Sequence, residues 1–231
     1  ILTAPKYGFY AAHTGGKPFK FQRPYGDYVL PHSMFKFVAA GMHSQSSVEC
    51  AFKLHPLVKD RIADIARIEI RSQRALMGIM YKTGPLHNPA DRDHCVQYII
   101  AVGLIHGELK PQDFEDDFAA DPRIDRLRDL TVVTENPQYS RDFVDPAKRS
   151  SANAVQVFFK DGSRTPKVDV EFLIGDVRRR KEAMPLLERK FRNNLAGRFA
   201  GKQQAAITAL LTDAQRLQAT PVNEFMDLLA V

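Results

Sequence analysis

The sequence has little cysteine and none of the short motifs that identify a redox or metal-dependent enzyme. Only two of its 231 residues are cysteine, Cys50 and Cys95, and each lies in an apolar stretch with helical spacing. Such cysteines are typical of reduced core thiols in a cytosolic protein. Two thiolates are also fewer than an iron–sulfur cluster usually needs. We therefore expect a cytoplasmic protein without a disulfide framework or an iron–sulfur centre.

Other diagnostic motifs are missing as well. The sequence contains no GxGxxG fingerprint, no phosphate-binding GxxxxGK[ST] loop, no HExxH, no paired CxxC and no GxSxG elbow. Its seven histidines show no spacing typical of metal ligands. No stretch approaches the roughly 20 apolar residues that a membrane-spanning helix needs. We therefore expect no metal, no cofactor and no membrane contact.

The charge balance is moderately basic. Lys and Arg number 33 against 27 Asp and Glu, which gives a formal net charge of +6. A basic balance suits a nucleic acid, an anionic membrane surface or an anionic substrate. The densest basic run, 178–181, contains no aromatic residue, and we interpret it as a solvated loop. A nucleic-acid-binding module that uses this run is an alternative, and its binding would weaken steeply with salt.

Periodicity and capping signals predict a mixture of helices and short strands. The clearest helix covers 89–105, because Asn88 can cap it, Pro89 suits its first turn and Gly107 can end it. A glycine break at Gly15-Gly16 follows a helix end in 1–16, and 17–38 suits short strands or extended segments. Further helices are predicted over 43–54, 112–118, 122–130, 185–199, 202–211 and 221–229. Strands are predicted over 62–71, 130–134 and 151–174, the last with a turn at Asp161-Gly162.

These elements favour an α+β fold, in which helices pack on one small mixed or antiparallel sheet. Helices and strands alternate, but no fingerprint of a parallel βαβ unit accompanies them. The segment 76–81 suits either an extended stretch or a short helix. The 44% hydrophobic content is enough to bury a sizeable core.

Four polar side chains are candidates for a binding site, and each has a plain structural alternative. Lys36 lies between two phenylalanines, so on a strand it would face a cleft as a carboxylate anchor or face solvent as an ordinary cation. His43 at a helix start could act as an acid or base, or could be a cap or surface residue. Tyr98 could contact a ligand or lie in the core with its hydroxyl satisfied. Arg23 precedes a tight turn and is a further carboxylate candidate.

Eight segments taken together resemble the MmgE/PrpD family. No single segment is a catalytic motif, but their order and their coverage of nearly the whole chain make the resemblance specific. They are FQRPYGDYVL at 21–30, MFK at 34–36, HSQSSVECAFKLH at 43–55, NPADRDHCVQYIIAVGLIHGEL at 88–109, DPRIDRLRD at 121–129, DPAKRSSANAVQVFFKDGS at 145–163, PLLERKFRNNLAGRF at 185–199 and PVNEFMDLL at 221–229.

The resemblance implies a particular domain organisation. Family members combine a large all-helical domain with a smaller α+β lid domain, and the active site lies between them. Residues 1–16 would be the end of the helical domain, 17–180 the lid domain, and 181–231 helices that return to the helical domain. The resemblance thus implies that the chain is the carboxyl-terminal part of a longer enzyme, a homodimer when complete, and inactive as this part alone.

The resemblance also implies an activity and roles for the candidates. The activity is a hydro-lyase reaction on a small tricarboxylate, the conversion of 2-methylcitrate to 2-methyl-cis-aconitate and water in propionate breakdown, without a cofactor. Lys36 would bind a carboxylate, Tyr98 would donate a hydrogen bond to the substrate, and His43 would orient the substrate or move a proton. Arg23 would be a weaker carboxylate ligand. The main acid and base would lie outside this chain, and a cis-aconitate decarboxylase or a related diacid isomerase is the alternative within the same fold.

Overall fold

The computed structural model describes residues 2–20 and 32–230, and its contacts divide the chain into two units, Ile1–Ser33 and Met34–Val231. In its described part the first unit contains one helix, α1 (Phe9–Thr14). Gly15 ends α1 in the left-handed conformation, with φ of 62°. The helix end and glycine break expected in 1–16 are therefore confirmed.

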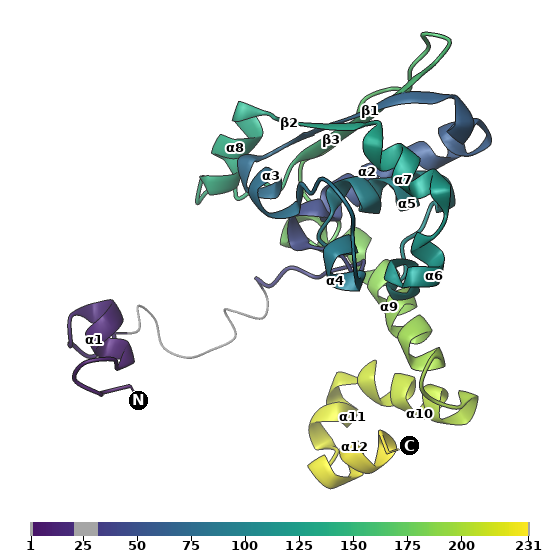
Figure 1. The fold of residues 1–231 in the computed structure, drawn as a ribbon. Helices are drawn as coiled ribbons and strands as arrows, with labels where there is room; N and C mark the ends of the chain where they lie inside the picture. Colours follow the sequence, from purple (N-terminus) through teal and green to yellow (C-terminus); the bar gives the residue numbers. More distant parts are fainter. Residues whose placement is uncertain (1, 21–31, 231) are drawn as a thin grey trace. The chain divides into compact units, whose positions relative to one another are not determined.

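The second unit is built around a four-stranded mixed sheet (Figure 1). Its strands are β1 (Ile65–Ser72), β2 (Thr131–Glu135), β3 (Asn153–Phe159) and β4 (Val168–Val170), in the order β2-β1-β3-β4. The strand β1 runs parallel to β2 and antiparallel to β3, and β3 runs antiparallel to β4. The expected α+β fold with one small mixed sheet is confirmed.

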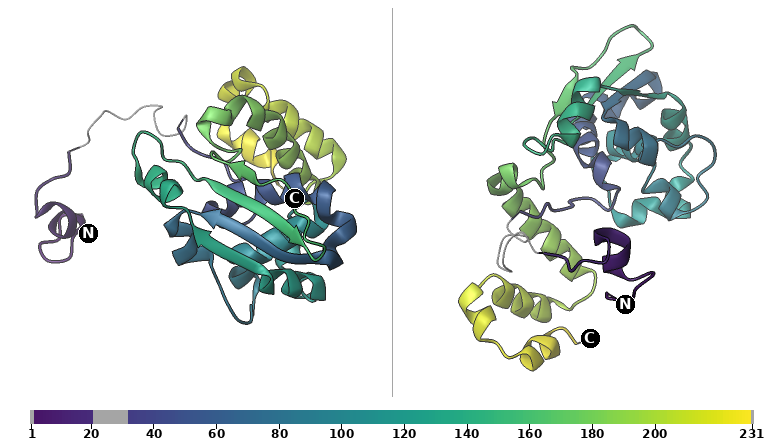
Figure 2. Two further views of the ribbon diagram at one scale, coloured as in Figure 1. Left: turned by 90° about the horizontal axis from the view of Figure 1, so that it is seen from above. Right: turned by 90° about the vertical axis from the view of Figure 1, so that its left-hand side faces the viewer.

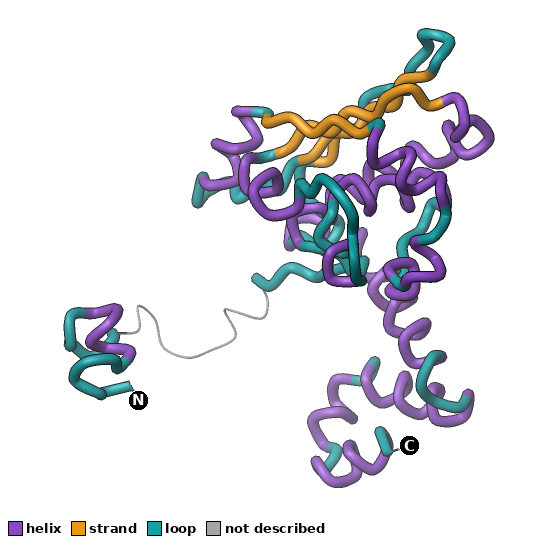
Figure 3. Tube along the Cα trace, viewed as in Figure 1, coloured by secondary structure: helices purple, strands orange, loops and turns teal. Residues whose placement is uncertain are grey.

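The helices of this unit lie mainly below the sheet and beyond it (Figures 1 and 3). Within the described residues they are α2 (Gln45–Val58), α3 (Arg74–Met80), α4 (Pro89–Arg92), α5 (Val96–His106), α6 (Asp116–Ala119), α7 (Pro122–Asp129), α8 (Pro137–Val144), α9 (Arg180–Ala196), α10 (Gly201–Leu211), α11 (Ala214–Ala219) and α12 (Val222–Leu228). Of the described helices, none is long and apolar enough to cross a lipid bilayer.

One face of the sheet carries the core, and the other faces solvent. Ile65, Ile68 and Ile70 of β1 are fully buried. The outward side chains Arg67 and Glu69 form an ion pair at 2.7 Å instead. This alternation is the strand pattern expected for a half-buried sheet. Figure 2, seen from above, shows the strands of the described chain uncovered by helices on that outer side.

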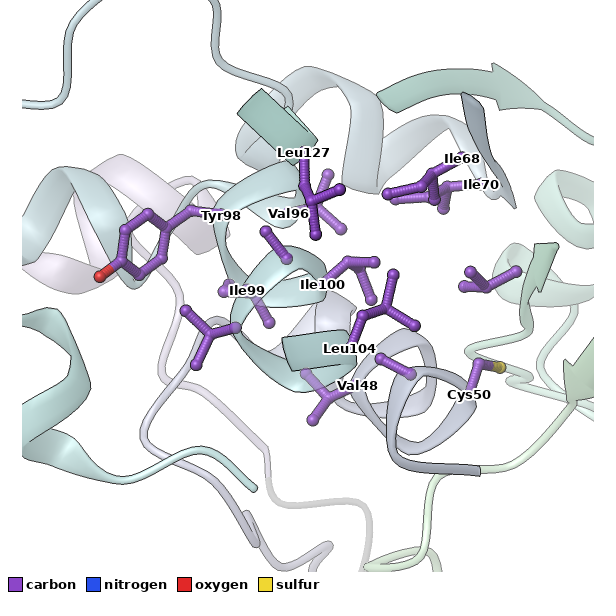
Figure 4. Packing of buried hydrophobic residues seen from close by; sticks show 14 of the residues in the cluster. Val48, Cys50, Ile68, Ile70, Val96, Tyr98, Ile99, Ile100, Leu104 and Leu127 are labelled. Carbon is purple, nitrogen blue, oxygen red and sulfur yellow. The ribbon is translucent and has the colours of Figure 1, made fainter. Parts of the chain in front are cut away.

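The helix α5 is the centre of the core. Its residues from Val96 to Ile105 are all buried, as expected for a helix surrounded by other elements. It packs against α2 on one side and α7 on another, and Figure 4 shows its apolar side chains between Leu127 and Val48. Both cysteines are free and buried, as expected, and burial raises the pKa of Cys50 to about 12.

Several features differ from the sequence-based expectations, and three of them concern helices. The helix expected over 89–105 is broken at Cys95, whose ψ of 105° is extended, so that α4 and α5 are separate. The run 178–181 is no solvated loop, because it leads directly into α9, which begins five residues before the expected Pro185. The helix α8 was not expected, although Asn136 and Pro137 begin it with the same cap and first-turn signal as Asn88 and Pro89.

We expect Gly103→Ala to destabilise the protein by about 1–3 kcal/mol, because the core where α2 and α5 meet has no room for a methyl group. A Cβ atom on Gly103 would lie 2.9 Å from the Cβ of Ala51. Gly78→Ala in α3 is the matched control, because nothing lies within 4 Å of its added Cβ. The control should be neutral or stabilising by up to about 1 kcal/mol. Urea unfolding of both variants measures the difference, and equal stabilities would contradict the proposed packing.

Candidate functional site

The side chain of Gln45, at the start of α2, fixes the segment that carries Lys36. Its amide oxygen accepts hydrogen bonds from the backbone N–H groups of Phe37 and Val38, both at 3.3 Å. Its amide nitrogen donates to the carbonyls of Val38 and Ala40, both at 3.1 Å. Gln45 is 5% exposed, so these bonds satisfy a buried amide that would otherwise be costly. The backbone between Phe37 and Ala40 is therefore held by one side chain.

Lys36 lies in this irregular segment and not on a strand. No strand forms in the described residues 17–20 and 32–38, so of the two alternatives expected for 17–38, short strands or extended segments, the strand and with it a strand face for Lys36 is wrong there. The neighbouring Phe35 donates its backbone N–H to the carbonyl of Gly175 at 3.0 Å. A side chain at Gly175 would collide with the carbonyl of Phe35, because its Cβ would lie only 1.8 Å away. This close approach holds the segment against the connection between β4 and α9, and it leaves the Lys36 side chain exposed.

His43 lies in a short 3₁₀ turn, Met42–Ser44, directly before α2. Its carbonyl accepts a hydrogen bond at 3.0 Å from the amide of Asn153, the first residue of β3. Its ring packs against that of Phe143 at 5.4 Å between centroids. The ring atom Nδ1 is buried without a hydrogen-bond partner among the described residues. Burial lowers the pKa of His43 below 6.5, which favours the neutral imidazole.

Two serines near the start of α2 make buried hydrogen bonds instead of capping the helix. Ser44 occupies the cap position but makes no side-chain cap bond, and its hydroxyl donates to the carbonyl of Gly41 at 2.8 Å. The hydroxyl of Ser46 accepts from Asn153 at 2.7 Å and donates to the carbonyl of Ser151. These buried bonds tie the start of α2 to the start of β3 and thereby position His43.

The break between α4 and α5 also serves this segment. Because the helix stops there, the carbonyl of Asp93 is free to accept the backbone N–H of Gly41 at 2.9 Å. The carboxylate of Asp93 meets Nδ1 of the adjacent His94 at 2.6 Å. The segment from Lys36 to His43 is thus held by hydrogen bonds to three residues, Gln45, Asn153 and Asp93.

Tyr98 does not lie with Lys36 and His43 on this segment. It is 2% exposed, and its hydroxyl donates to the carbonyl of Asp113 at 2.5 Å. Burial raises the pKa of the Tyr98 hydroxyl to about 12. Figure 4 shows the Tyr98 oxygen directed away from Ile100 and Leu104. The remaining candidate, Arg23, lies outside the described residues.

Several residues that shape this site were not anticipated from the sequence. Nothing in the sequence pattern marks Gln45 or Asn153 as important, because a buried amide is recognised only when its hydrogen-bond partners are known. The described residues contain no group of three or more His, Cys, Asp and Glu that could hold a metal ion. The side chains at hand are an exposed ammonium and a neutral imidazole, which suit binding of an anion and transfer of a proton.

Comparison with known proteins identifies a family that the chain resembles over most of its length. Residues 38–215 match the model of the MmgE/PrpD C-terminal domain. The whole chain is 50% identical to a 2-methylcitrate dehydratase of Cupriavidus necator over 49% of that protein, and 45% identical to one of Salmonella typhimurium over 48%. A 2-methylcitrate dehydratase, mitochondrial, of Yarrowia lipolytica is 44% identical over 99% of this chain and 44% of the relative. The chain thus spans about half the length of the curated relatives it matches.

We expect His43 to make folding stability depend on pH. Its folded-state pKa lies below the ordinary value of 6.5, so the unfolded chain takes up this proton first as pH falls. Stability should therefore decrease as pH drops below about 6.5, and it should decrease less in His43→Gln. Urea unfolding of both proteins from pH 7.5 to pH 5.5, about one unit on either side, isolates His43, because all other groups are common. Identical pH profiles would show that His43 is not desolvated in the folded protein.

Proposed function

The chain belongs to the MmgE/PrpD family, and we propose that it is the carboxyl-terminal half of a 2-methylcitrate dehydratase. The 50% identity with the relative of that name, over the whole of this chain, carries the proposal. In this reaction a C–H bond and a C–O bond of 2-methylcitrate break and a C=C bond forms. The proton and the hydroxide leave together as water.

Lys36 is assigned to binding a substrate carboxylate and stabilising the charge that develops as the adjacent carbon loses its proton. Its ammonium is exposed and has no ion-pair partner in the part of the chain that the structure describes. A fixed cation beside a developing negative charge lowers the barrier, because it needs no reorganisation during the reaction. The bonds of Gln45 and Gly175 hold the backbone on either side of Lys36 and supply that preorganisation.

His43 is assigned to orienting the substrate or moving a proton. A neutral imidazole can accept a proton near neutral pH, and the lowered pKa of His43 supports that state. Tyr98 is assigned to a hydrogen bond with the substrate, for which its hydroxyl has to turn away from the carbonyl of Asp113. Arg23 is assigned to a weaker carboxylate contact.

The remaining family features come to this chain only through the resemblance. We assign 17–180 to a lid domain, 1–16 to the end of an all-helical domain and 181–231 to helices that return to it. The complete enzyme would be a cytoplasmic homodimer that needs no cofactor, and its main acid and base would lie in the half not present here.

A nucleic-acid-binding role for the basic run 178–181 is less well supported. Arg178 pairs with Asp176 at 3.1 Å, and Arg179 pairs with Glu49 and Glu182 at 2.7 Å each. These carboxylates neutralise two of the four positive charges. A salt-dependent association with DNA or RNA at low ionic strength would revive this alternative.

We expect the full-length enzyme to dehydrate 2-methylcitrate, and this 231-residue chain alone to give negligible turnover. Lys36→Gln in the full-length enzyme should lower kcat/KM by roughly 100-fold, because it removes a charge that stabilises the transition state. The ultraviolet absorbance of the new double bond measures the rate.

Lys59→Gln is the control, because Lys59 is an exposed lysine at the far end of α2 and loses the same charge. Its kcat/KM should stay within about twofold of wild type. Measurable turnover by the isolated chain would contradict the assignment of the main acid and base to the other half. Turnover of cis-aconitate to a decarboxylated product, with none of 2-methylcitrate, would replace the dehydratase with a decarboxylase.

A further inference from the structure

A second lysine, far away in the sequence, meets Lys36. Lys190 lies in the middle of α9, and its ammonium donates a hydrogen bond of 2.5 Å to the backbone carbonyl of Lys36, across 154 residues. Its side chain is half-buried, whereas that of Lys36 is exposed. The two lysines therefore come from different elements and meet at the segment fixed by Gln45.

The start of α9, the helix that carries Lys190, is held by well-formed contacts. Arg179, directly before α9, bonds both carboxylate oxygens of Glu49 in α2, at 2.7 and 2.9 Å. It also donates to the carbonyl of Phe172 at 2.8 Å. A bidentate pair of this kind fixes orientation as well as distance. The start of α9 is thereby anchored to the helix that begins beside His43.

The charges at this point are not balanced. Neither Lys36 nor Lys190 has a carboxylate within ion-pair distance among the described residues. The two carboxylates in the anchoring contacts, Glu49 and Glu182, already form ion pairs with Arg179. Burial, followed by the charge of Lys36, lowers the pKa of Lys190. The ammonium of Lys190 thus lies at the Lys36 backbone, within the influence of the Lys36 charge, so an anion that contacts both cations would be stabilised.

Lys148, which forms ion pairs, provides a contrast within the same chain. Its ammonium contacts Asp142 at 2.7 Å and Glu171 at 3.2 Å. Those carboxylates raise the pKa of Lys148, which is the opposite of the shift at Lys190. No such carboxylate pairs with Lys190 in the described part of the chain, which distinguishes it from a lysine in a surface ion-pair network.

We propose that Lys190 is a second substrate-binding cation, which together with Lys36 holds one carboxylate group of the tricarboxylate. This inference rests on the proposed function, because it places Lys190 in the same site. A substrate with three carboxylates needs several cations, and a pair on two anchored elements would hold one carboxylate in a single orientation. Lys190 would loosen its bond to the Lys36 carbonyl, or share it, when the carboxylate binds.

Steady-state kinetics of the full-length enzyme with 2-methylcitrate tests the role of Lys190. Lys190→Gln should raise KM roughly 10- to 100-fold, because it removes a hydrogen bond to a charged group, and Lys190→Arg should recover most of the loss. Arg189→Gln loses the same charge at the exposed neighbouring position and should leave KM within about twofold. A purely structural role would lower kcat or stability and leave KM unchanged.

A second measurement uses the wild-type enzyme alone, so its outcome does not depend on whether a variant folds. Acetylation of the wild-type enzyme with acetic anhydride, read by mass spectrometry, should slow at Lys36 and Lys190 when 2-methylcitrate is saturating, but not at the exposed Lys181. Unchanged acetylation of Lys190, or a KM for Lys190→Gln equal to that of Arg189→Gln, would overturn the inference. If the wild-type enzyme still turns over 2-methylcitrate in that case, the proposed function stands. Absence of any turnover of 2-methylcitrate by wild type would refute the function itself, and the inference with it.

Discussion

The amide of Gln45 is the constraint on which the candidate site depends. Four hydrogen bonds, two accepted and two donated, bind it to the backbone between Phe37 and Ala40. That backbone has no partner in the sheet and is not helical, so its polar groups need an alternative. The buried side chain of Gln45 supplies most of the hydrogen bonds that these polar groups need. Gln45 therefore fixes the backbone that separates Lys36 from His43.

This constraint is useful only because the core makes α2 rigid. The helix α2 carries Gln45 at its first residue and packs its buried face on α5, where Gly103 permits a close approach to Ala51. At the same end, the amide of Asn153 connects α2 to β3. The geometry of the site is thus set where α2, β3 and the break between α4 and α5 meet, and not by a flexible loop. Such preorganisation is what charge stabilisation in catalysis requires.

Much of the fold could be predicted from the sequence, because its signals are local. The alternation in β1 and the proline and glycine at the ends of the 89–107 stretch act over a few residues, and the elements formed near the expected places. The break at Cys95 could not be predicted, because it is stabilised by the distant Gly41 N–H that takes the carbonyl of Asp93. The strand, one of the two alternatives expected around Lys36, does not form for a similar reason, since Gln45 supplies the hydrogen bonds that a neighbouring strand would have supplied.

The site residues were harder to predict than the fold, because their roles depend on charge pairing across the chain. The sequence contains many lysines, and nothing local distinguishes Lys190 from Lys148. The structure distinguishes them by the carboxylates around each. The same comparison applies to the carboxylates beside the segment that carries Lys36 and His43. The carboxylates of Glu49 and Asp93, nearest to the site segment in sequence or by contact, are engaged by Arg179 and His94. On the proposed function, this half binds and orients the tricarboxylate, and a carboxylate or imidazole that removes the proton has to approach from the other half.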